Sequence, residues 1–382
     1  MLYRAIGGTG LEASIIGLGT EHLDHKPYSQ VEPTIHAALD AGINIFDLFM
    51  PGEEVRCHIG RSLAGRRDKV MIQGHIGSVD KNGQYAQSRD LATCKARFED
   101  LLRDLGTDYI DFGMLFFIDT DDHWRQVVEN GILDYAKQLK QQGVIRAIGA
   151  SSHNPLVARR LVETGEIELL MFSINPAFDM MPADLMLDDM FDAKNADKVK
   201  AGINPVRTAL YQVCERQGVG ITVMKSLGSG KLLDPAQTPF ARPLSAAQCI
   251  HYALTRPAVA SALVGCQTPA QVAEAVGYLE LADAERDYTS VVDGYKGDFR
   301  GSCVYCNHCL PCPVGIDVAS VNRYLDIALL DPGHIPPSIR QHYESLPAAG
   351  ADCIACGACE GRCPFGVPVI RNMERAAELF GR

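Results

Sequence analysis

Short apolar runs alternate with longer amphipathic segments along roughly the first two thirds of the chain. Eight of the runs are bounded by Gly or polar residues, which is typical of strands buried on both faces of a parallel sheet. They cover Ser14–Gly19, Ile43–Asp47, Val70–His75, Tyr109–Phe116, Val144–Ala150, Glu168–Ile174, Gly220–Met224 and Ser261–Gly265. A stretch of helical period follows each run, and eight strand–helix units in about 280 residues predict an α/β fold, the (β/α)8 barrel.

Three segments depart from this alternation. The Gly-rich turn at 7–10, between Tyr3 and Ser14, predicts a β-hairpin that plugs the floor of the barrel. The connection at 76–87 is polar and contains Gly, so we expect a loop that shapes substrate access. The connection at 175–204 carries Met180, Met181, Met186 and Met190. Its spacing predicts a short core-facing helix over 184–192, with an adaptable apolar substrate surface as the alternative.

Cysteine is concentrated at the C-terminal end of the chain. Of the 13 cysteines, eight form two runs, each followed by Pro: Cys303, Cys306, Cys309 and Cys312, then Cys353, Cys356, Cys359 and Cys363. Runs at two-residue spacing closed by Cys-Pro predict two [4Fe–4S] clusters. Structural zinc is the alternative, but zinc needs only four ligands. The other five cysteines, at 57, 94, 214, 249 and 266, are expected to be ordinary core or surface thiols.

A helical pattern over Val318–Leu330 separates the two cysteine runs. The module therefore resembles the α-helical two-cluster ferredoxins. This resemblance implies crossed ligation. Cys303, Cys306, Cys309 and Cys363 would hold one cluster, and Cys353, Cys356, Cys359 and Cys312 the other. We expect a barrel domain at 1–287, a linker at 288–302 and the cluster domain at 303–382.

Composition narrows the possible partners. The chain carries 47 acidic and 36 basic side chains, a formal net charge of −11, which argues against nucleic acid or an anionic membrane as the main partner. No apolar run is long enough to enter a membrane. The first residues do not form an export signal, so a cytoplasmic location is expected and disulfides are not.

Five segments occur in the order typical of one enzyme family. They are Tyr3–Thr20, Ala38–Asp47, Leu105–Asp111, Ile148–Ser151 and Val223–Leu232. Together they resemble the aldo-keto reductases, in particular the bacterial branch with a C-terminal 4Fe–4S domain. That family reduces carbonyls with NAD(P)H and an Asp-Tyr-Lys-His tetrad at the barrel mouth.

Most of the tetrad is missing from this sequence. Its Asp matches Asp47, but no tyrosine occurs at 48–54, where the proton donor is expected. His75 stands at the place of the Lys and Phe116 at the place of the His. Two residues that would hold the nicotinamide are replaced by Ser152 and Met171. Because general acid catalysis contributes about 10²–10⁴-fold to such rates, we do not expect an ordinary carbonyl reductase.

A different set of polar residues falls at or just past the C-terminal ends of the strands. Barrel enzymes place their catalysts there, and the candidates are Asp47, His75, His153 and His22. Strands two and three are neighbours, so Asp47 could hold the His75 imidazole as an acid or base. The alternative for His22 is a solvated loop, and that for His153 is a position beside a helix cap. The run 119–123 is expected to be a solvated loop and N-cap for a helix beginning near Trp124.

Two Gly-rich turns resemble the family's cofactor contacts. Leu227, Gly228 and Gly230 would face a pyrophosphate, Gly265 and Gln267 the adenosine side, and Glu274 the adenine. Such a phosphate cup fits NAD(P)H and also FMN. Thr20, Ser151, Ser152 and Lys225 complete the set of cofactor-binding candidates. Gln271 stands where an Arg would bind a 2′-phosphate, and a turn kept for packing is the alternative.

These features predict an iron–sulfur oxidoreductase. Its clusters would exchange electrons with a flavin or a nicotinamide that acts on a small organic substrate, with a redox partner protein as electron donor or acceptor. Two alternatives remain. The barrel could perform non-redox acid–base chemistry as a lyase or isomerase, or the chain could be an electron-transfer subunit.

Overall fold

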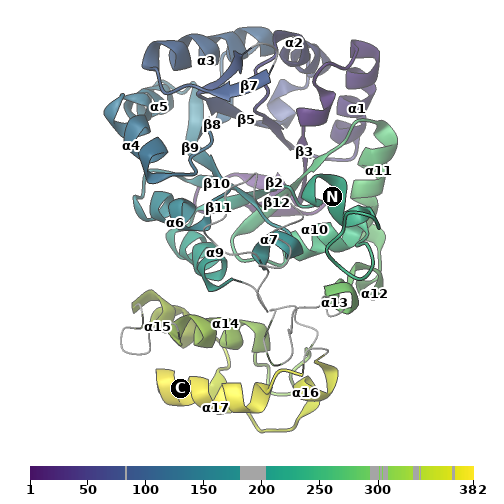
Figure 1. The fold of residues 1–382 in the computed structure, drawn as a ribbon, viewed down its shortest axis with the longest axis vertical. Helices are drawn as coiled ribbons and strands as arrows, with labels where there is room; N and C mark the ends of the chain where they lie inside the picture. Colours follow the sequence, from purple (N-terminus) through teal and green to yellow (C-terminus); the bar gives the residue numbers. More distant parts are fainter. Residues whose placement is uncertain are drawn as a thin grey trace. The chain divides into compact units, whose positions relative to one another are not determined.

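The computed structural model describes residues 1–81, 84–180, 204–292, 301, 303, 309–329, 335, 337–363 and 366–382 (Figure 1). Contacts divide the chain into two compact units. The first comprises Met1–Asn175, Leu210–Lys231 and Ser245–Arg286. The second comprises Pro176–Ala209, Leu232–Leu244 and Asp287–Arg382.

Eight parallel strands of the first unit close into a barrel, as the apolar runs predict. In spatial order they are β3 (Ile16–Gly19), β4 (Ile45–Leu48), β5 (Met71–Ile76), β8 (Ile110–Leu115), β9 (Ile145–Ser152), β10 (Leu169–Ser173), β11 (Gly220–Met224) and β12 (Val259–Gly265). The register Val264↔Leu18 pairs the last strand with the first. Inward-facing side chains such as Ile45, Met71 and Phe112 fill the interior. The predicted barrel is confirmed.

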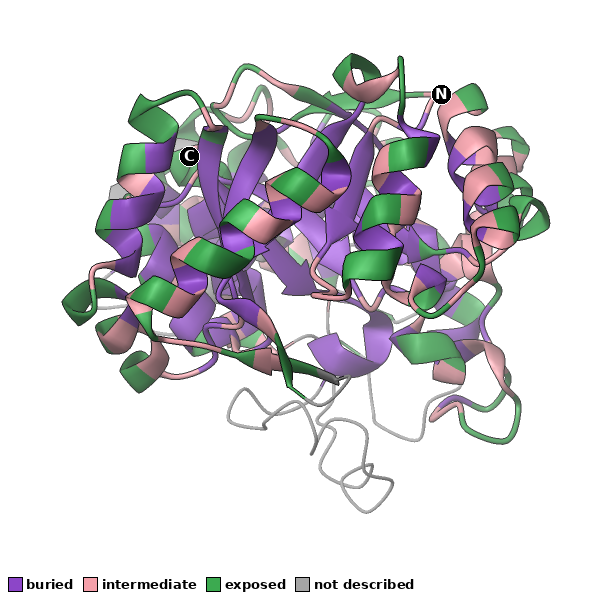
Figure 2. Cartoon of the chain, turned by 90° about the horizontal axis from the view of Figure 1, so that it is seen from above, coloured by how far each residue is buried: buried purple, intermediate pink, exposed green. Residues whose placement is uncertain are grey.

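Amphipathic helices surround the strands. Figure 2 shows their buried residues facing the sheet and their exposed residues facing outward. They are α1 (Tyr28–Asp40), α2 (Glu53–Ser62), α3 (Leu91–Leu105), α4 (Asp121–Glu129), α5 (Ile132–Gln141), α6 (Pro155–Glu163), α9 (Pro205–Gln217), α10 (Ala246–Leu254) and α11 (Pro269–Gly277). Shorter helices are η1 (Glu21–Leu23), η2 (Arg67–Lys69), α7 (Pro176–Asp179), η4 (Gly228–Leu233), η5 (Tyr278–Glu280), α12 (Asp283–Arg286) and α13 (Thr289–Val292).

Two antiparallel hairpins lie outside the barrel strands. The predicted floor hairpin is confirmed as β1 (Tyr3–Ala5) paired with β2 (Glu12–Ser14). The expectation of a loop at 76–87 is wrong, because β6 (Ser78–Lys81) pairs there with β7 (Gln84–Gln87). The sequence contains a signal for this hairpin. Asn-Gly at 82–83 is the dipeptide most favoured in two-residue hairpin turns.

Two other expectations concern the longer connections. Met180 is buried, whereas Met181, Met186, Met190 and the helix predicted over 184–192 lie outside the described residues. The expected linker at 288–302 begins differently from the prediction. Tyr288 is buried and α13 follows it with Val291 and Val292 also buried, because these side chains have enough apolar surface to join a core.

The C-terminal part of the second unit is helical. It contains α14 (Val318–Ala328), α15 (Pro337–Glu344), η6 (Gly350–Asp352), α16 (Ala358–Arg362) and α17 (Val369–Phe380). The helix predicted at 318–330 is confirmed over Val318–Ala328, and residue 330 lies outside the described residues. Asn372 on α17 donates a hydrogen bond to Asn322 on α14 at 2.7 Å. The Tyr343 ring stacks on Phe380 with 4.1 Å between centroids. These contacts join α14, α15 and α17 into one small core.

Candidate functional site

A carboxylate and two side chains from the next strand form a buried polar centre at the barrel mouth. Asp47 on β4 pairs in register with Gln73 on β5, and His75 lies two residues further along the same face. His75 Nε2 donates to Asp47 Oδ1 at 2.8 Å, and Gln73 Nε2 donates to the same oxygen at 3.0 Å. The three residues are between 0% and 3% exposed. The structure thus brings Asp47 and His75 together as expected and adds Gln73, which the sequence analysis missed.

Thr20 fixes the strand end that carries Asp47. Its hydroxyl donates to the Asp47 carbonyl at 2.7 Å, and the side chain is buried. On the other side, the Met171 sulfur lies 3.7 Å from Gln73 Nε2. Thr20 is a cofactor-binding candidate from the sequence, and here its hydroxyl is engaged within the protein.

Aromatic rings cover His75. The Phe116 ring meets the imidazole edge-on at 5.3 Å between centroids, and Phe49 lies at 6.1 Å. Tyr85, from hairpin strand β7, contacts both phenylalanines, with centroid distances of 5.2 Å to Phe49 and 6.4 Å to Phe116. Arg89 holds this arrangement by donating to the Phe116 carbonyl at 2.9 Å. The imidazole therefore sits in an apolar setting that strengthens its interaction with Asp47.

A second histidine–aspartate pair lies at the ends of neighbouring strands. His153 Nδ1 is 2.9 Å from Asp119 Oδ2, and the His153 backbone N–H donates to Oδ1 at 2.6 Å. Ser152 Oγ donates to Oδ1 at 3.1 Å. Burial disfavours the charged carboxylate, but the hydrogen bonds and charge from His153 outweigh it and lower the pKa of Asp119.

The expected solvated loop at 119–123 is wrong at its first residue. Asp119 is 2% exposed because it caps the end of β9 through His153 and Ser152. Helix α4 begins at Asp121 rather than near Trp124, with the Thr120 side chain accepting from the His123 N–H. Nothing in the local sequence shows that Asp119 faces inward, since its partners are more than 30 residues away.

Two phenylalanines connect the two pairs. The ring centroids are 5.3 Å apart from His75 to Phe116, 5.9 Å from Phe116 to Phe117 and 4.9 Å from Phe117 to His153. Ser151 Oγ accepts from the Phe117 N–H at 2.8 Å and so fixes this turn. The hydroxyls of Ser151 and Ser152, both cofactor-binding candidates, are buried and positioned to support the mouth.

His22 is located apart from these pairs. It is exposed on η1 and lies over Gly265, where an added Cβ would come 2.4 Å from His22 Cδ2. The Gly265 backbone therefore lies directly against the exposed His22 imidazole. The neighbouring Glu21 faces Lys225 at 3.6 Å. His22 is thus grouped with the Gly-rich loops rather than with Asp47 and His75.

The loop after β11 is a tight Gly-rich turn. Residues 228–230 have positive φ angles, and the Gly228 and Gly230 amides donate within the turn to Lys225 and Leu227. A Cβ at Gly230 would meet no atom within 4 Å, so the backbone can be approached closely there. The half-buried Lys225 supplies positive charge. The turn therefore combines an approachable backbone at Gly230 with a nearby lysine, while its Gly228 and Gly230 amides are already hydrogen-bonded.

The loop after β12 is closed by its own side chains. The Gln267 N–H donates to Gln271 Oε1 at 2.7 Å, and its carbonyl accepts from Gln30 and Thr34. Glu274 is exposed on α11. The Gln267 amide is therefore already satisfied within the protein, as are the Gly228 and Gly230 amides of the β11 loop.

Four cysteines from both runs line one pocket of the C-terminal part. They are Cys312, Cys353, Cys356 and Cys359, and apolar side chains such as Ile354, Val369 and Met373 complete the wall. This is the set that the ferredoxin resemblance assigns to one cluster. A pocket with four thiols and an otherwise apolar lining fits the donor set of an iron–sulfur cluster.

An arginine connects the two cysteine runs near the other predicted ligand set, Cys303, Cys306, Cys309 and Cys363. Arg362 on α16 donates to the Cys309 carbonyl through Nη2 and Nε, at 2.6 and 3.1 Å, and to the Pro311 carbonyl at 2.7 Å. Cys363 follows Arg362 directly, so these bonds tie its backbone to the first run. Cys303 is half-buried, and Cys306 lies outside the described residues.

The remaining cysteines do not belong to a cluster arrangement in the described part of the chain. Cys57 is exposed, and Cys94, Cys214, Cys249 and Cys266 are buried. Burial raises the pKa of the buried thiols, for Cys249 and Cys266 to about 12. They are therefore protonated near neutral pH and unreactive.

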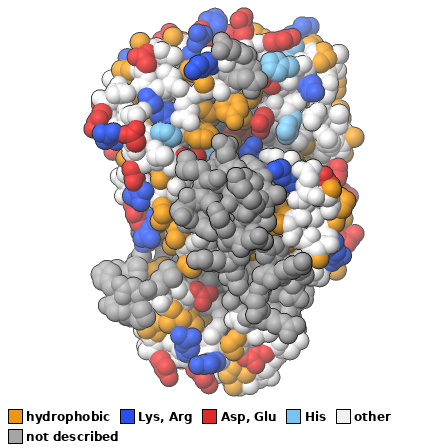
Figure 3. Space-filling model, in the orientation of Figure 1, with side chains coloured by type: hydrophobic (Ala, Val, Ile, Leu, Met, Phe, Trp, Pro, Cys, Tyr) orange, Lys and Arg blue, Asp and Glu red, His pale blue; other side chains and the backbone are white. Residues whose placement is uncertain are grey.

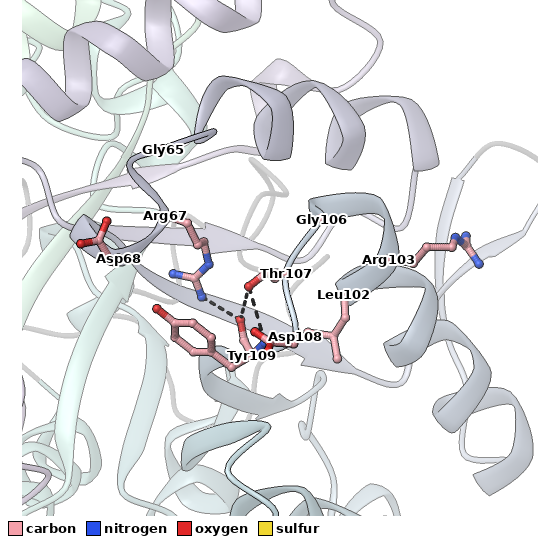
Figure 4. Close-up of a pocket in the computed structure, with 9 residues that line it drawn as sticks. All are labelled: Gly65, Arg67, Asp68, Leu102, Arg103, Gly106, Thr107, Asp108 and Tyr109. Atoms are coloured by element: carbon pink, nitrogen blue, oxygen red, sulfur yellow. Dashed lines mark hydrogen bonds between the residues drawn. The ribbon is translucent and has the colours of Figure 1, made fainter.

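A separate surface pocket lies at the opposite end of the barrel (Figure 4). Its lining comes from the segments before β5 and β8: Gly65, Arg67, Asp68, Leu102, Arg103, Gly106, Thr107, Asp108 and Tyr109. Asp47 and His75 lie at the C-terminal strand ends, where barrel enzymes act, so this pocket is not part of the candidate site. On the face seen in Figure 3, basic and acidic side chains are interspersed. In the described part of the chain, no helix has the length and apolarity to cross a membrane.

Comparison with known proteins identifies the class. The model of the aldo/keto reductase family matches residues 15–243, and the chain belongs to this family. It is 33% identical over 164 residues to aldo-keto reductase YhdN of Bacillus subtilis, a match that spans 40% of this chain and 47% of that protein. It is 25% identical over 299 residues to the uncharacterized oxidoreductase YqkF of the same species, spanning 75% of this chain and 92% of the relative.

Solved structures share the fold. Aldo-keto reductase AKR11C1 from Bacillus halodurans, in its holo form, superimposes with a TM-score of 0.58 at 22% identity, covering 76% of this chain and 96% of that one. A putative aldo-keto reductase from Pseudomonas aeruginosa gives 0.55 at 22% identity, covering 72% and 95%. At this identity the likeness shows the barrel and leaves the reaction open.

Proposed function

We propose that the protein is an iron–sulfur oxidoreductase that acts on a small organic substrate with a non-standard barrel site. The observation that carries the proposal is the pocket shared by Cys312, Cys353, Cys356 and Cys359, together with the two Cys-Pro-terminated runs. Bound clusters would supply single-electron transfer, to or from a redox partner protein. A flavin is the favoured two-electron centre because flavins convert between one- and two-electron steps, and NAD(P)H is the other candidate.

The barrel residues supply the proton chemistry in this proposal. Asp47, which also accepts a hydrogen bond from Gln73, orients His75 so that the imidazole accepts a proton at Nδ1, the nitrogen turned away from Asp47. Asp119 fixes His153 in the same manner through Nδ1. Phe49, Phe116 and Tyr85 exclude water from His75. The absence of a tyrosine at 48–54 argues against ordinary carbonyl reduction.

The deciding experiment is anaerobic purification followed by metal analysis and mass spectrometry of the released cofactor. We expect about eight iron atoms per chain, the sum of two four-iron clusters, and a mononucleotide flavin. Stoichiometric zinc with iron near zero would contradict the cluster assignment. Iron without any flavin or bound dinucleotide would leave an electron-transfer subunit as the better description.

The two histidine–aspartate pairs favour one alternative, a lyase or isomerase in which the clusters are structural. Acid and base groups at one mouth are what such a reaction requires. The alternative expects turnover to continue when the clusters are locked in either redox state. Our proposal expects turnover to stop in at least one of these states, and a rate measured with reduced and with oxidised protein separates the two.

A further inference from the structure

The polar centre at the mouth contains two buried atoms without a hydrogen-bond partner. They are Gln73 Oε1 and His75 Nδ1. Gln73 is 0% exposed and His75 3% exposed. Buried polar atoms in native proteins are nearly always paired, so two unpaired atoms in one site point to a ligand that forms a hydrogen bond with at least one of them.

The chemistry of both atoms follows from their bonds to Asp47. A carboxylate oxygen can only accept hydrogen bonds. The Gln73 amide therefore donates to Asp47 through its NH2 group, and its carbonyl oxygen has no partner. By the same reasoning His75 turns a hydrogen on Nε2 toward Asp47, and in this tautomer of the imidazole Nδ1 carries a lone pair. Both unpaired atoms are hydrogen-bond acceptors.

The surroundings decide what kind of group can reach them. Phe49 and Phe116 contact the imidazole and Tyr85 packs against both of them. Within the described part of the chain no N–H or O–H, that of Tyr85 included, donates to Nδ1. A carbonyl oxygen placed here would face acceptors only, which is unfavourable. A hydroxyl group would donate its hydrogen to one acceptor while its carbon framework packs against the rings.

We infer that the mouth binds a hydroxyl-bearing substrate with an apolar or aromatic body, in preference to the carbonyl compound of the same skeleton. Gln73 and His75 are the residues that set this specificity. The inference rests on the proposed function, because it takes the barrel mouth as the substrate site. A site for a carbonyl substrate would surround the carbonyl oxygen with hydrogen-bond donors, whereas this site presents acceptors.

The test compares 1-phenylethanol with acetophenone, which differ only in the oxidation state at one carbon. Isothermal titration calorimetry on the full-length, cluster-loaded protein is expected to show at least a tenfold tighter dissociation constant for the alcohol. Equal affinity, tighter ketone binding or no binding of either probe would each overturn the inference. The binding experiment tests the preference for the alcohol, whereas the iron and cofactor analysis tests the proposed function. A negative result in one is therefore distinguishable from a negative result in the other.

Variants and a spectroscopic readout locate the preference. Gln73→Met and His75→Phe should each bring the alcohol-to-ketone ratio close to one, while His25→Phe, an exposed histidine outside the site, should leave it unchanged. In 15N-histidine NMR the wild-type His75 Nδ1 should appear without a hydrogen and shift on adding the alcohol. A hydrogen on Nδ1 at neutral pH, or a ratio unaffected by Gln73→Met, would refute the assignment even if His75→Phe fails to fold.

Discussion

Single side chains determine how each histidine at the mouth is held. Asp47 Oδ1 receives two donors from one strand, whereas Asp119 receives its donors from a side chain, a backbone amide and a hydroxyl. Asp119 has more hydrogen-bond donors around its carboxylate than Asp47 has, and these hydrogen bonds lower the pKa of Asp119 despite burial. Asp119 is therefore a structural anchor of the mouth as well as the partner of His153.

Replacing Asp119 should have a pH-dependent cost. Asp119→Asn leaves buried donors mispaired and is expected to lower the free energy of unfolding by about 3 kcal/mol at neutral pH, as when one partner of a buried pair is removed. Because the pKa of Asp119 is depressed in the folded protein, its contribution is present above the ordinary value of 3.8. The contribution is lost as the pH falls through the folded value.

Urea unfolding at several pH values measures this prediction. The gap between wild type and Asp119→Asn should narrow below about pH 4. Asp121→Asn, at an exposed position two residues further along in the first turn of α4, provides the matched control and should change stability little. A gap that is constant or that widens in acid would show that Asp119 is not held as a carboxylate.

At the scale of elements, the sequence predicted repeating units well and their inward contacts poorly. The eight strands were placed correctly because each is an apolar run bounded by Gly or polar residues, a pattern that depends only on local sequence. Gln73 and Asp119 were missed because their burial depends on partners from distant segments. The β6–β7 hairpin was missed although Asn82-Gly83 signals it, since the flanking residues are mostly polar.

The segments that bring Cys312 next to the second cysteine run also yield a prediction. If the thiols that line one pocket hold one cluster, Cys312→Ser should reduce iron from about eight to about four atoms per chain. A further Cys356→Ser substitution should remove little more, because both residues serve the same cluster. Combining Cys312→Ser with Cys309→Ser should remove nearly all iron.

Iron and protein assays on the purified variants check this pattern. Cys57→Ser, which changes an exposed cysteine outside the runs, should retain full iron content. If the Cys312/Cys309 pair behaves as one cluster and the Cys312/Cys356 pair as two, ligation follows sequence order and the crossed assignment is wrong.

For the whole molecule, the match to the aldo/keto reductase family establishes the barrel, and the residues at its mouth argue for a different reaction. With NADPH and simple aldehydes we expect turnover about 10²-fold or more below that of an enzyme with a complete acid catalyst. His75→Lys should not restore it, because no tyrosine lies at 48–54 for a lysine to activate. NADPH absorbance under anaerobic conditions measures the rate, and rapid turnover by the wild type would contradict the prediction.

The aromatic cover over His75 has a consequence for isotopes. The imidazole side chain is only 1% exposed, so a hydrogen nucleus on its ring meets bulk water only when Phe49, Tyr85 and Phe116 move apart. A deuteron delivered from a labelled hydroxyl would then remain beside the molecule that supplied it. In a reversible reaction that deuteron would return to the same molecule instead of exchanging with water. The fraction of label retained would therefore measure how often the aromatic cover opens while one substrate molecule is bound.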